Sequence, residues 1–500
     1  MKVLLVSTNR ERSPYPVAPL GALCVAAAAR AAGHEVEFLD LGFLAAPHRA
    51  LRRALARGTC HAVAFSIRNL DNCFVLAPRS YFEDVRQLAE TARRCFRGPL
   101  ILGGSGFSVA PQGWMQRLKA DYGVIGEGER AFVQLLRRLE TGAAPGELEG
   151  VISQSTSVSH LNGRSSVPPR TLHGSASVLA SAETPVLLHD DWAREDARPA
   201  VLDDLPKPAH HSCRYRKYLR RGGCVSVQTK RGCPFACIYC TYPQLEGKRY
   251  RLREPEAVVD EIEAAIAGAS LHHVFFVDSV FNDPREHALA VCAALRRRQL
   301  PMRWMAFCNP VGFNAELARA MAQSGCEGLE LGLDAATPKM LAALRKPFDQ
   351  KEIPVALQAA HDAGLPFAVH LLFGGPGETW RDVVEAQAFL NGCAPANSIF
   401  AAFGIRIYEG TAIATIASLE GVLAPGNDLF DPAYYVSPAL AERAEIKLDR
   451  IARRRPEWTS PVDWRRPLMR WTQKVMNLLD VRPQWKDIRG YGLHMRRALR

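Results

Sequence analysis

Short apolar runs alternate with alanine-rich amphipathic stretches over the first 145 residues. The apolar runs predict strands over residues 2–7, 35–41, 62–67, 100–103 and 121–125, and a helical pattern covers residues 19–32. Helical stretches also separate the later strands. Strands that alternate with helices form a parallel sheet covered on both faces. We therefore expect residues 1–145 to fold as a doubly wound α/β domain.

Polar residues and glycines follow the carboxyl ends of these predicted strands. In open α/β sheets, ligands bind at that edge. The predicted cofactor-binding residues at this edge are Ser7, Thr8, Asn9, Ser66, Arg68, Asn69, Gly103, Gly104, Ser105, Gly126, Glu127 and Gly128. No Gly-x-Gly-x-x-Gly fingerprint follows the first strand, which is evidence against a dinucleotide as the ligand.

The remaining chain divides into three further regions. Residues 146–200 are rich in Ser, Thr, Gly and Pro, as expected of a linker. Residues 201–415 resume the alternation, with strands predicted over 225–228, 273–278, 302–309, 328–332, 367–374 and 399–407. Six such strands predict a partial (β/α)6 barrel that is open on one side. Residues 416–500 predict a Trp- and Arg-rich helical C-terminal region.

Composition and charge narrow the functional classes. Apolar residues make up 48% of the 500-residue chain and charged residues 23%, values typical of a globular protein rather than a disordered one. No apolar run is long enough for a transmembrane segment or a signal peptide, so we expect a cytoplasmic protein. Of the net charge of +12, residues 443–500 contribute most, with 16 Lys and Arg against 6 Asp and Glu. The rest is close to neutral, so we do not expect a nucleic-acid partner.

One group of cysteines is clustered among the 13 in the chain. Cys233, Cys237 and Cys240 follow a predicted strand with the spacing C-x3-C-x2-C. Three thiolates on a cubane cluster leave one iron open, and the amino and carboxylate groups of S-adenosylmethionine (SAM) can chelate that iron. The alternative is structural zinc with Cys224 or Cys213 as fourth ligand. Zinc sites usually contain a second pair of Cys or His ligands, and no such pair follows.

The segment Thr229–Pro243 resembles the cluster loop of the radical SAM superfamily, and further motifs in the same order extend this resemblance over roughly residues 225–415. The resemblance implies a [4Fe–4S] cluster on the three cysteines and SAM as a cofactor. It implies SAM contacts from Tyr239, Asp278, Glu330 and the turn Gly374, Gly375, Pro376 and Gly377. Asp278 is the candidate for the SAM amino group, because the family's usual Gly-Gly-Glu is absent.

Residues 1–145 resemble the Rossmann-like cobalamin-binding domain that precedes the barrel in cobalamin-dependent radical SAM methylases and cyclases. The Asp-x-His-x-x-Gly motif of the better-known cobalamin fold is absent, so no histidine is expected to coordinate cobalt from below. A flavodoxin-like domain without cobalamin is the alternative. Arg68 lies either under the corrin or in an ordinary loop, paired with Asp71.

The two resemblances together imply a methyltransferase. In that family, cobalamin takes a methyl group from one SAM, and a second SAM gives a 5′-deoxyadenosyl radical that activates an unactivated substrate carbon. A cobalamin-assisted cyclase or rearrangement enzyme is the alternative. A more remote one is a metal-containing protein that binds RNA or a carrier through its basic tail. The implied partners are a small-molecule or carrier-bound substrate and an electron donor such as flavodoxin or ferredoxin.

Overall fold

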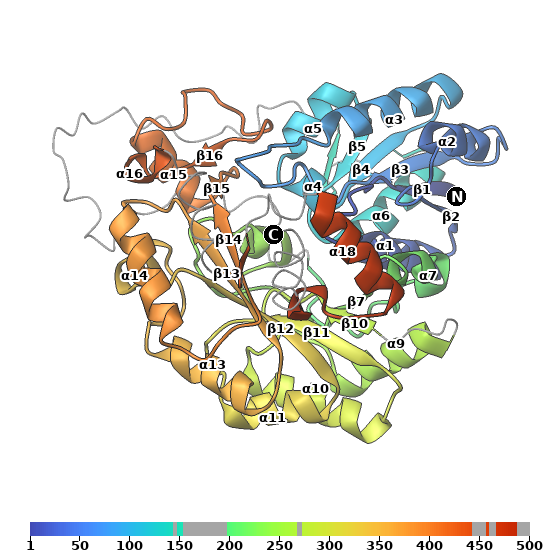
Figure 1. Cartoon of the computed structure of the whole chain (residues 1–500). Coiled ribbons are helices and arrows are strands. Elements are labelled where there is room, and N and C mark those ends of the chain that lie inside the picture. Colours follow the sequence, from blue (N-terminus) through green and yellow to red (C-terminus); the bar gives the residue numbers. More distant parts are fainter. Residues whose placement is uncertain (144–147, 154–197, 268–272, 443–456, 460–466, 488–500) are drawn as a thin grey trace.

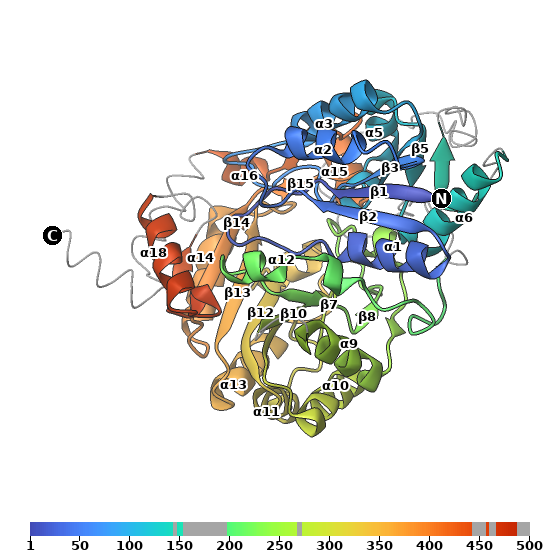
Figure 2. The same cartoon turned by 90° about the vertical axis from the view of Figure 1, so that its right-hand side faces the viewer.

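The computed structural model describes residues 1–143, 148–153, 198–267, 273–442, 457–459 and 467–487. Most of the predicted linker and much of the basic tail, including Arg453 and Trp464, lie outside these residues. The described chain forms two large sheets, and the blue N-terminal sheet lies above the green-to-orange sheet in both views (Figures 1 and 2). In the described part of the chain, no helix has the length and apolarity needed to cross a membrane.

The N-terminal sheet has the predicted strands with parallel pairing. Among the described residues its order is β2-β1-β3-β4-β5-β6. The strands are β1 (Lys2–Ser7), β2 (Glu35–Asp40), β3 (Ala62–Ser66), β4 (Leu100–Gly103), β5 (Tyr122–Val124) and β6 (Val151–Ser153). Only β6 runs antiparallel, and it lies beyond residue 145, so the sheet continues into the range predicted as linker.

Helices cover both faces of this sheet, which confirms the doubly wound prediction. They are α1 (Leu20–Ala31), α2 (Pro47–Leu55), α3 (Phe82–Cys95), α4 (Ser105–Ser108), α5 (Pro111–Leu118) and α6 (Gly128–Glu140). On one face α2, α3 and α5 bury Leu51, Leu88 and Trp114, and on the other α1 and α6 bury Ala26 and Leu135. Apolar stripes on the helices thus produce two core layers, one on each side of the strands.

The second sheet is the predicted partial barrel with one additional strand. In the described residues its order is β17-β14-β13-β12-β11-β10-β7, all parallel. The strands are β7 (Val225–Val227), β10 (His273–Phe276), β11 (Arg303–Cys308), β12 (Cys326–Asp334), β13 (Phe367–Phe373), β14 (Ser398–Phe403) and β17 (Trp458–Thr459). The region predicted as helical thus supplies β17, whose two residues carry too little alternation to be recognised in the sequence.

Helices cover the outer face of the barrel sheet (Figure 1). They include α9 (Pro255–Ala267), α10 (Arg285–Arg298), α11 (Ala315–Gln323), α12 (Pro338–Ala343), α13 (Glu352–Asp362) and α14 (Trp380–Asn391). Smaller elements are η2 (His210–Ser212), α7 (Tyr215–Leu219), β8 (Lys230–Arg231), α8 (Tyr242–Glu246), β9 (Arg251–Leu252), β15 (Ile405–Arg406), α15 (Ala412–Leu419), β16 (Tyr434–Tyr435) and α16 (Pro438–Ala441).

A C-terminal segment packs on the inner face of the barrel sheet. It follows helix α18 (Pro467–Leu478) and ends in η4 (Gln484–Asp487). Trp485 is buried against Ala368 of β13 and Phe400 of β14. At Gly328 of β12 an added Cβ would lie 2.7 Å from the Pro483 side chain, so only glycine allows this approach. The C-terminal segment therefore closes part of the barrel interior.

Candidate active site

A cavity of about 1170 Å³ lies between the carboxyl edge of the N-terminal sheet and the inner face of the barrel sheet. Of the residues predicted at that edge, the structure brings together around the cavity Ser7, Asn9, Ser66, Arg68, Asn69, Gly103, Gly104, Ser105, Gly126, Glu127 and Gly128. Thr8 is buried instead, and its hydroxyl donates to the Ser66 carbonyl at 3.1 Å. The volume exceeds that of pockets for drug-sized ligands, so the cavity has room for a large cofactor and a second molecule.

Close backbone packing shapes the N-terminal wall of the cavity. Gly104 has a φ of +96°, and a Cβ there would lie 2.5 Å from the Ile67 carbonyl oxygen. This glycine allows the β4 loop to lie directly against the end of β3. Gly103, Gly104 and Gly106 therefore present backbone rather than side chains to the cavity, which would leave room for a flat ring such as the corrin of cobalamin.

Arg68 extends into the cavity from the end of β3. Its alternative partner Asp71 binds Arg406 instead, with 2.7 Å between Arg406 Nε and Asp71 Oδ2. Within the residues that the structure describes, the Arg68 guanidinium has no ion-pair partner, and burial lowers its pKa. His34, His48 and His61 bind other groups of the N-terminal domain and do not line the cavity. The protein side of the predicted cobalamin face is thus a guanidinium rather than an imidazole.

The cysteine loop borders the cavity between β8 and α8, where Thr241 and Tyr242 line it. Gly232 precedes the loop with a φ of +95°, and a Cβ there would meet the Arg249 carbonyl oxygen at 2.0 Å. Burial raises the pKa of all three cluster thiols, that of Cys240 to about 12. Metal coordination deprotonates such thiols outright. The loop therefore provides sheltered thiols that become thiolates when a cluster binds.

The surroundings of the cysteines give no support to the zinc alternative. In the described parts of the chain, no three His, Cys, Asp or Glu side chains surround a point that one metal ion could occupy. Cys224 and Cys213, the proposed fourth zinc ligands, pack in apolar clusters, and burial raises the pKa of both thiols.

A charged network lies beside the cluster cysteines. Lys346 Nζ and the Tyr239 hydroxyl each lie 2.5 Å from Asp334 Oδ2. Burial acts to raise the pKa of Asp334, but the Lys346 ammonium lowers it overall, and Asp334 in turn raises the pKa of Lys346. Asp334 has a φ of +60° and follows a register shift in β12. No sequence motif indicates Lys346, which is 12 residues from its partner Asp334.

Two other groups that were predicted to contact SAM form hydrogen bonds within the protein. Asp278 accepts hydrogen bonds from the Thr229 amide at 2.8 Å and the Thr229 hydroxyl at 2.6 Å, and thereby fixes the strand end that leads to the cluster loop. The amides of Gly374 and Gly375 donate to Glu378 Oε2 at 2.6 and 3.0 Å. Asp278 and the Gly374–Gly377 turn do not line the cavity, and their contacts with SAM remain predictions.

Glu330 is the predicted residue that does face the cavity from the barrel. It accepts hydrogen bonds from His370 Nε2 at 3.1 Å, Trp485 Nε1 at 3.3 Å and the Tyr15 hydroxyl at 3.4 Å. All four residues line the cavity. Its partners come from β13, the C-terminal segment and the N-terminal domain, so this carboxylate connects three regions of the chain.

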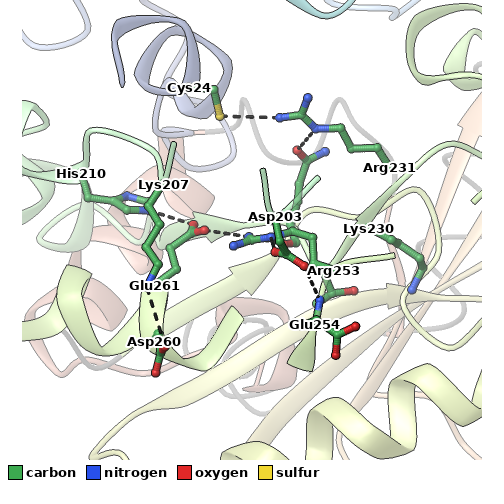
Figure 3. A network of polar contacts seen from close by, with 12 residues as sticks. Cys24, Asp203, Lys207, His210, Lys230, Arg231, Arg253, Glu254, Asp260 and Glu261 are labelled. Atoms are coloured by element: carbon green, nitrogen blue, oxygen red, sulfur yellow. Dashed lines mark hydrogen bonds and ion pairs between the residues drawn. The ribbon is translucent and has the colours of Figure 1, made fainter. Parts of the chain in front are cut away.

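Glu127 connects the N-terminal domain to the cluster loop. Its carboxylate binds Arg251 through both oxygens and lies 3.0 Å from Arg231 Nη1, and Arg231 Nη2 lies 2.6 Å from Glu129. Cys24 of α1 also approaches Arg231, as Figure 3 shows. Arg231 is two residues before Cys233. This interdomain clamp of Glu127, Glu129, Arg231 and Arg251 thus fixes the cluster loop against the N-terminal domain.

Comparisons with known proteins assign both halves of the chain. Residues 7–136 match the B12 binding domain model, and residues 227–390 match the radical SAM superfamily model. Tryptophan 2-C-methyltransferase of Streptomyces laurentii is 28% identical over 485 residues, which cover 84% of this chain and 75% of the relative. Hopanoid C-3 methylase of Methylococcus capsulatus is 24% identical over 71% of this chain and 60% of its own length.

Solved structures show the same fold. The radical SAM methyltransferase TsrM from Kitasatospora setae, with cobalamin and a [4Fe–4S] cluster bound, superposes with a TM-score of 0.79 at 24% identity over 99% of both chains. A second structure of TsrM contains tryptophan substrate and a SAM analogue. The cobalamin-dependent enzyme OxsB matches with a TM-score of 0.65 at 14% identity over 90% of this chain and 66% of OxsB.

Proposed function

Because this chain belongs to the cobalamin-dependent radical SAM methyltransferases, we propose that it transfers a methyl group to a carbon atom of a small aromatic substrate such as tryptophan. The observation that carries the proposal is the shared cavity, which the strand ends of the B12 domain, the edge of the cluster loop and the inner barrel face all line. One chamber can therefore hold the methyl donor and the acceptor together, which methyl transfer requires.

The residues that would hold each cofactor follow from this geometry. Cobalamin would lie on Ser66, Gly104 and their neighbours at the strand ends, and Cys233, Cys237 and Cys240 would bind the cluster. When bound, cobalamin and SAM supply methyl transfer and radical formation. The protein orients them, since the clamp fixes the cluster loop and Arg68 presents a non-coordinating cation to the cobalamin site.

The substrate class is supported by the cavity wall on the barrel side. Phe307, Phe400 and Trp485 line it together with Met305, and aromatic side chains favour a flat apolar ligand. The relative from Streptomyces laurentii is named for tryptophan, and TsrM was solved with tryptophan bound. Tryptophan is therefore the first compound to test.

The experiment is a product analysis with anaerobically reconstituted enzyme, SAM, a reductant and tryptophan. We expect a substrate mass gain of one methyl group, with S-adenosylhomocysteine and 5′-deoxyadenosine in roughly equal amounts. Methylated product without 5′-deoxyadenosine would retain methyl transfer and reject the radical step. Substrate consumption with 5′-deoxyadenosine but background S-adenosylhomocysteine would reject methyl transfer in favour of cyclisation.

A further inference from the structure

We propose that His370, oriented by Glu330, binds the ring N–H of an aromatic heterocycle and so makes the site selective for an indole-like substrate. This inference rests on the proposed function and specifies the substrate of the same cavity. In this pair of side chains, Nδ1 of His370 is the polar atom that a ligand can bind.

The hydrogen bond to Glu330 determines which imidazole nitrogen is available. His370 Nε2 lies 3.1 Å from Glu330 Oε2, and an ionised carboxylate can only accept, so Nε2 carries the proton. In a neutral imidazole the other nitrogen, Nδ1, is then an acceptor. Among the described residues, Nδ1 has no hydrogen-bond partner. A bound N–H donor would satisfy it.

Glu330 is itself anchored, so this orientation is fixed. The carboxylate is 4% exposed, and Trp485 and Tyr15 donate to its other oxygen at 3.3 and 3.4 Å. Rotation of Glu330 away from His370 would leave a buried carboxylate oxygen without its donor, which is costly. The imidazole therefore presents the same acceptor to each ligand that enters.

The surroundings of His370 fit a planar ring. Phe400 stacks on the His370 imidazole, with 4.9 Å between the ring centroids and 28° between the ring planes. The Phe307 ring is arranged edge-on to the imidazole, with 6.1 Å between the ring centroids. Phe307 is 36% exposed, an unusual value for a phenylalanine on the inner face of a barrel. Its free surface faces the cavity that it lines. These rings provide an apolar wall next to one acceptor, which is the pattern of a specific ligand site.

Gly332 leaves room beside this wall. It pairs with His370 across β12 and β13, and alternation along β12 places it on the same sheet face as Glu330. The nearest atom to an added Cβ would be the Cys308 carbonyl oxygen at 3.8 Å. A side chain at position 332 could therefore extend without a clash from the sheet face that carries His370.

The position of His370 also suits methyl transfer. Its neighbour Leu371 pairs with Asp334 across β12 and β13, and Asp334 binds Tyr239 of the cluster loop. On the other side, Tyr15 donates a hydrogen bond to Glu330, and Tyr15 and Arg68 both line the cavity. A ring bound at His370 thus lies between the cluster side and the cobalamin side of the cavity.

The test compares two ligands that differ in one group. L-tryptophan and 3-(3-benzothienyl)-L-alanine have nearly the same shape, but sulfur replaces the ring N–H in the second. Calorimetric titration of reconstituted holoenzyme should give about tenfold tighter binding of tryptophan, the preference expected for one buried hydrogen bond. His370→Phe keeps the ring stack and should remove the preference, whereas His370→Asn, which retains an acceptor, should restore part of it.

Two controls separate this proposal from misfolding and from the proposed function. His361→Phe changes an exposed histidine on α13 and should leave the preference intact. Gly332→Phe should block both ligands. Cluster absorbance should be the same in all variants, which shows that each one folds and is loaded. S-adenosylhomocysteine formation from SAM without acceptor reports methyl transfer to the cofactor and should be unchanged in His361→Phe. Equal binding of both ligands to the wild type, a preserved preference in His370→Phe, or no tryptophan binding would overturn the proposal. Loss of S-adenosylhomocysteine formation in the wild type would instead overturn the proposed function.

Discussion

Replacement of Glu127 by alanine should destabilise the whole protein, because Glu127 is shared by two arginines across the domain boundary. Its carboxylate binds Arg251 through both oxygens and Arg231 at 3.0 Å, and its side chain is only 7% exposed. The sequence placed Glu127 among the cofactor residues. The structure shows in addition that it connects the N-terminal sheet to the strand before the cluster loop.

The size of the stability loss depends on which hydrogen-bond acceptors each arginine keeps after the substitution. Removal of one partner from a buried ion pair costs about 3–5 kcal/mol. After Glu127→Ala, Arg231 keeps Glu129 at 2.6 Å, and Arg251 keeps the carbonyl oxygens of Pro199 and Glu246 at 3.0 and 2.8 Å. Because neither guanidinium is left without an acceptor, we expect the lower end of that range, a loss of about 3 kcal/mol in the free energy of unfolding.

Denaturant unfolding of reconstituted protein measures this loss, and Glu37→Ala is the matched control. Glu37 pairs with the exposed Arg57, so its removal should cost less than about 1 kcal/mol. The double variant Glu127→Ala/Arg251→Ala should be less destabilised than the sum of the single variants, because the pair interacts directly. If Glu127→Ala and Glu37→Ala unfold at the same denaturant concentration, the clamp does not stabilise the domain boundary.

Three further predictions address the cluster, the cobalamin and a buried carboxyl. Reductive SAM cleavage should be lost when any one of Cys233, Cys237 and Cys240 is replaced by alanine, whereas Cys224→Ala should retain the cluster absorbance. Formation of 5′-deoxyadenosine by a variant that lacks all three cysteines would contradict this. Cobalt(II)-loaded protein should show no splitting from an axial histidine nitrogen in its electron paramagnetic resonance spectrum, since no histidine of the B12 domain lines the cavity. A splitting that changes when the protein's histidines are labelled with nitrogen-15 would refute it. Burial raises the pKa of Glu378 from 4.5 to about 7, so the folded protein keeps a proton that the unfolded chain releases, and stability falls as pH rises through that window. Glu378→Gln should remove about 3 kcal/mol of that fall, as measured by unfolding at both ends of the window, and an unchanged pH dependence would refute the assignment.

Local patterns in the sequence predicted the fold, and they point to Cys233, Cys237 and Cys240 as the cluster ligands, which remains a prediction. Strand β1 was predicted with its observed bounds, and the barrel strands were located within a few residues, because each carries a strong apolar run. The cysteine triad has a spacing that depends only on neighbouring residues. The strand ends likewise indicated where the cavity would lie, and the two family matches confirm the cofactor types.

Long-range pairs could not be predicted in the same way. Glu330 and His370 are 40 residues apart, and Glu127 and Arg251 are 124 apart. No periodicity encodes such contacts, because the first arises only when strands β12 and β13 pair and the second only when the two domains pack together. Trp485 was seen as part of a basic tail, and its role in the cavity depends on a buried contact that composition does not report.

The contact of Trp485 with the barrel has a consequence for biosynthesis. The cavity is lined by residues from Leu5 to Trp485, so its last wall can form only after a ribosome has released the chain as far as Trp485. The N-terminal sheet can form much earlier, since its strands end at Ser153. Cobalamin can therefore meet a finished platform before the barrel interior is sealed. A nascent chain halted before Arg482 would expose Ala368 and Phe400, and such an apolar surface is one that chaperones bind.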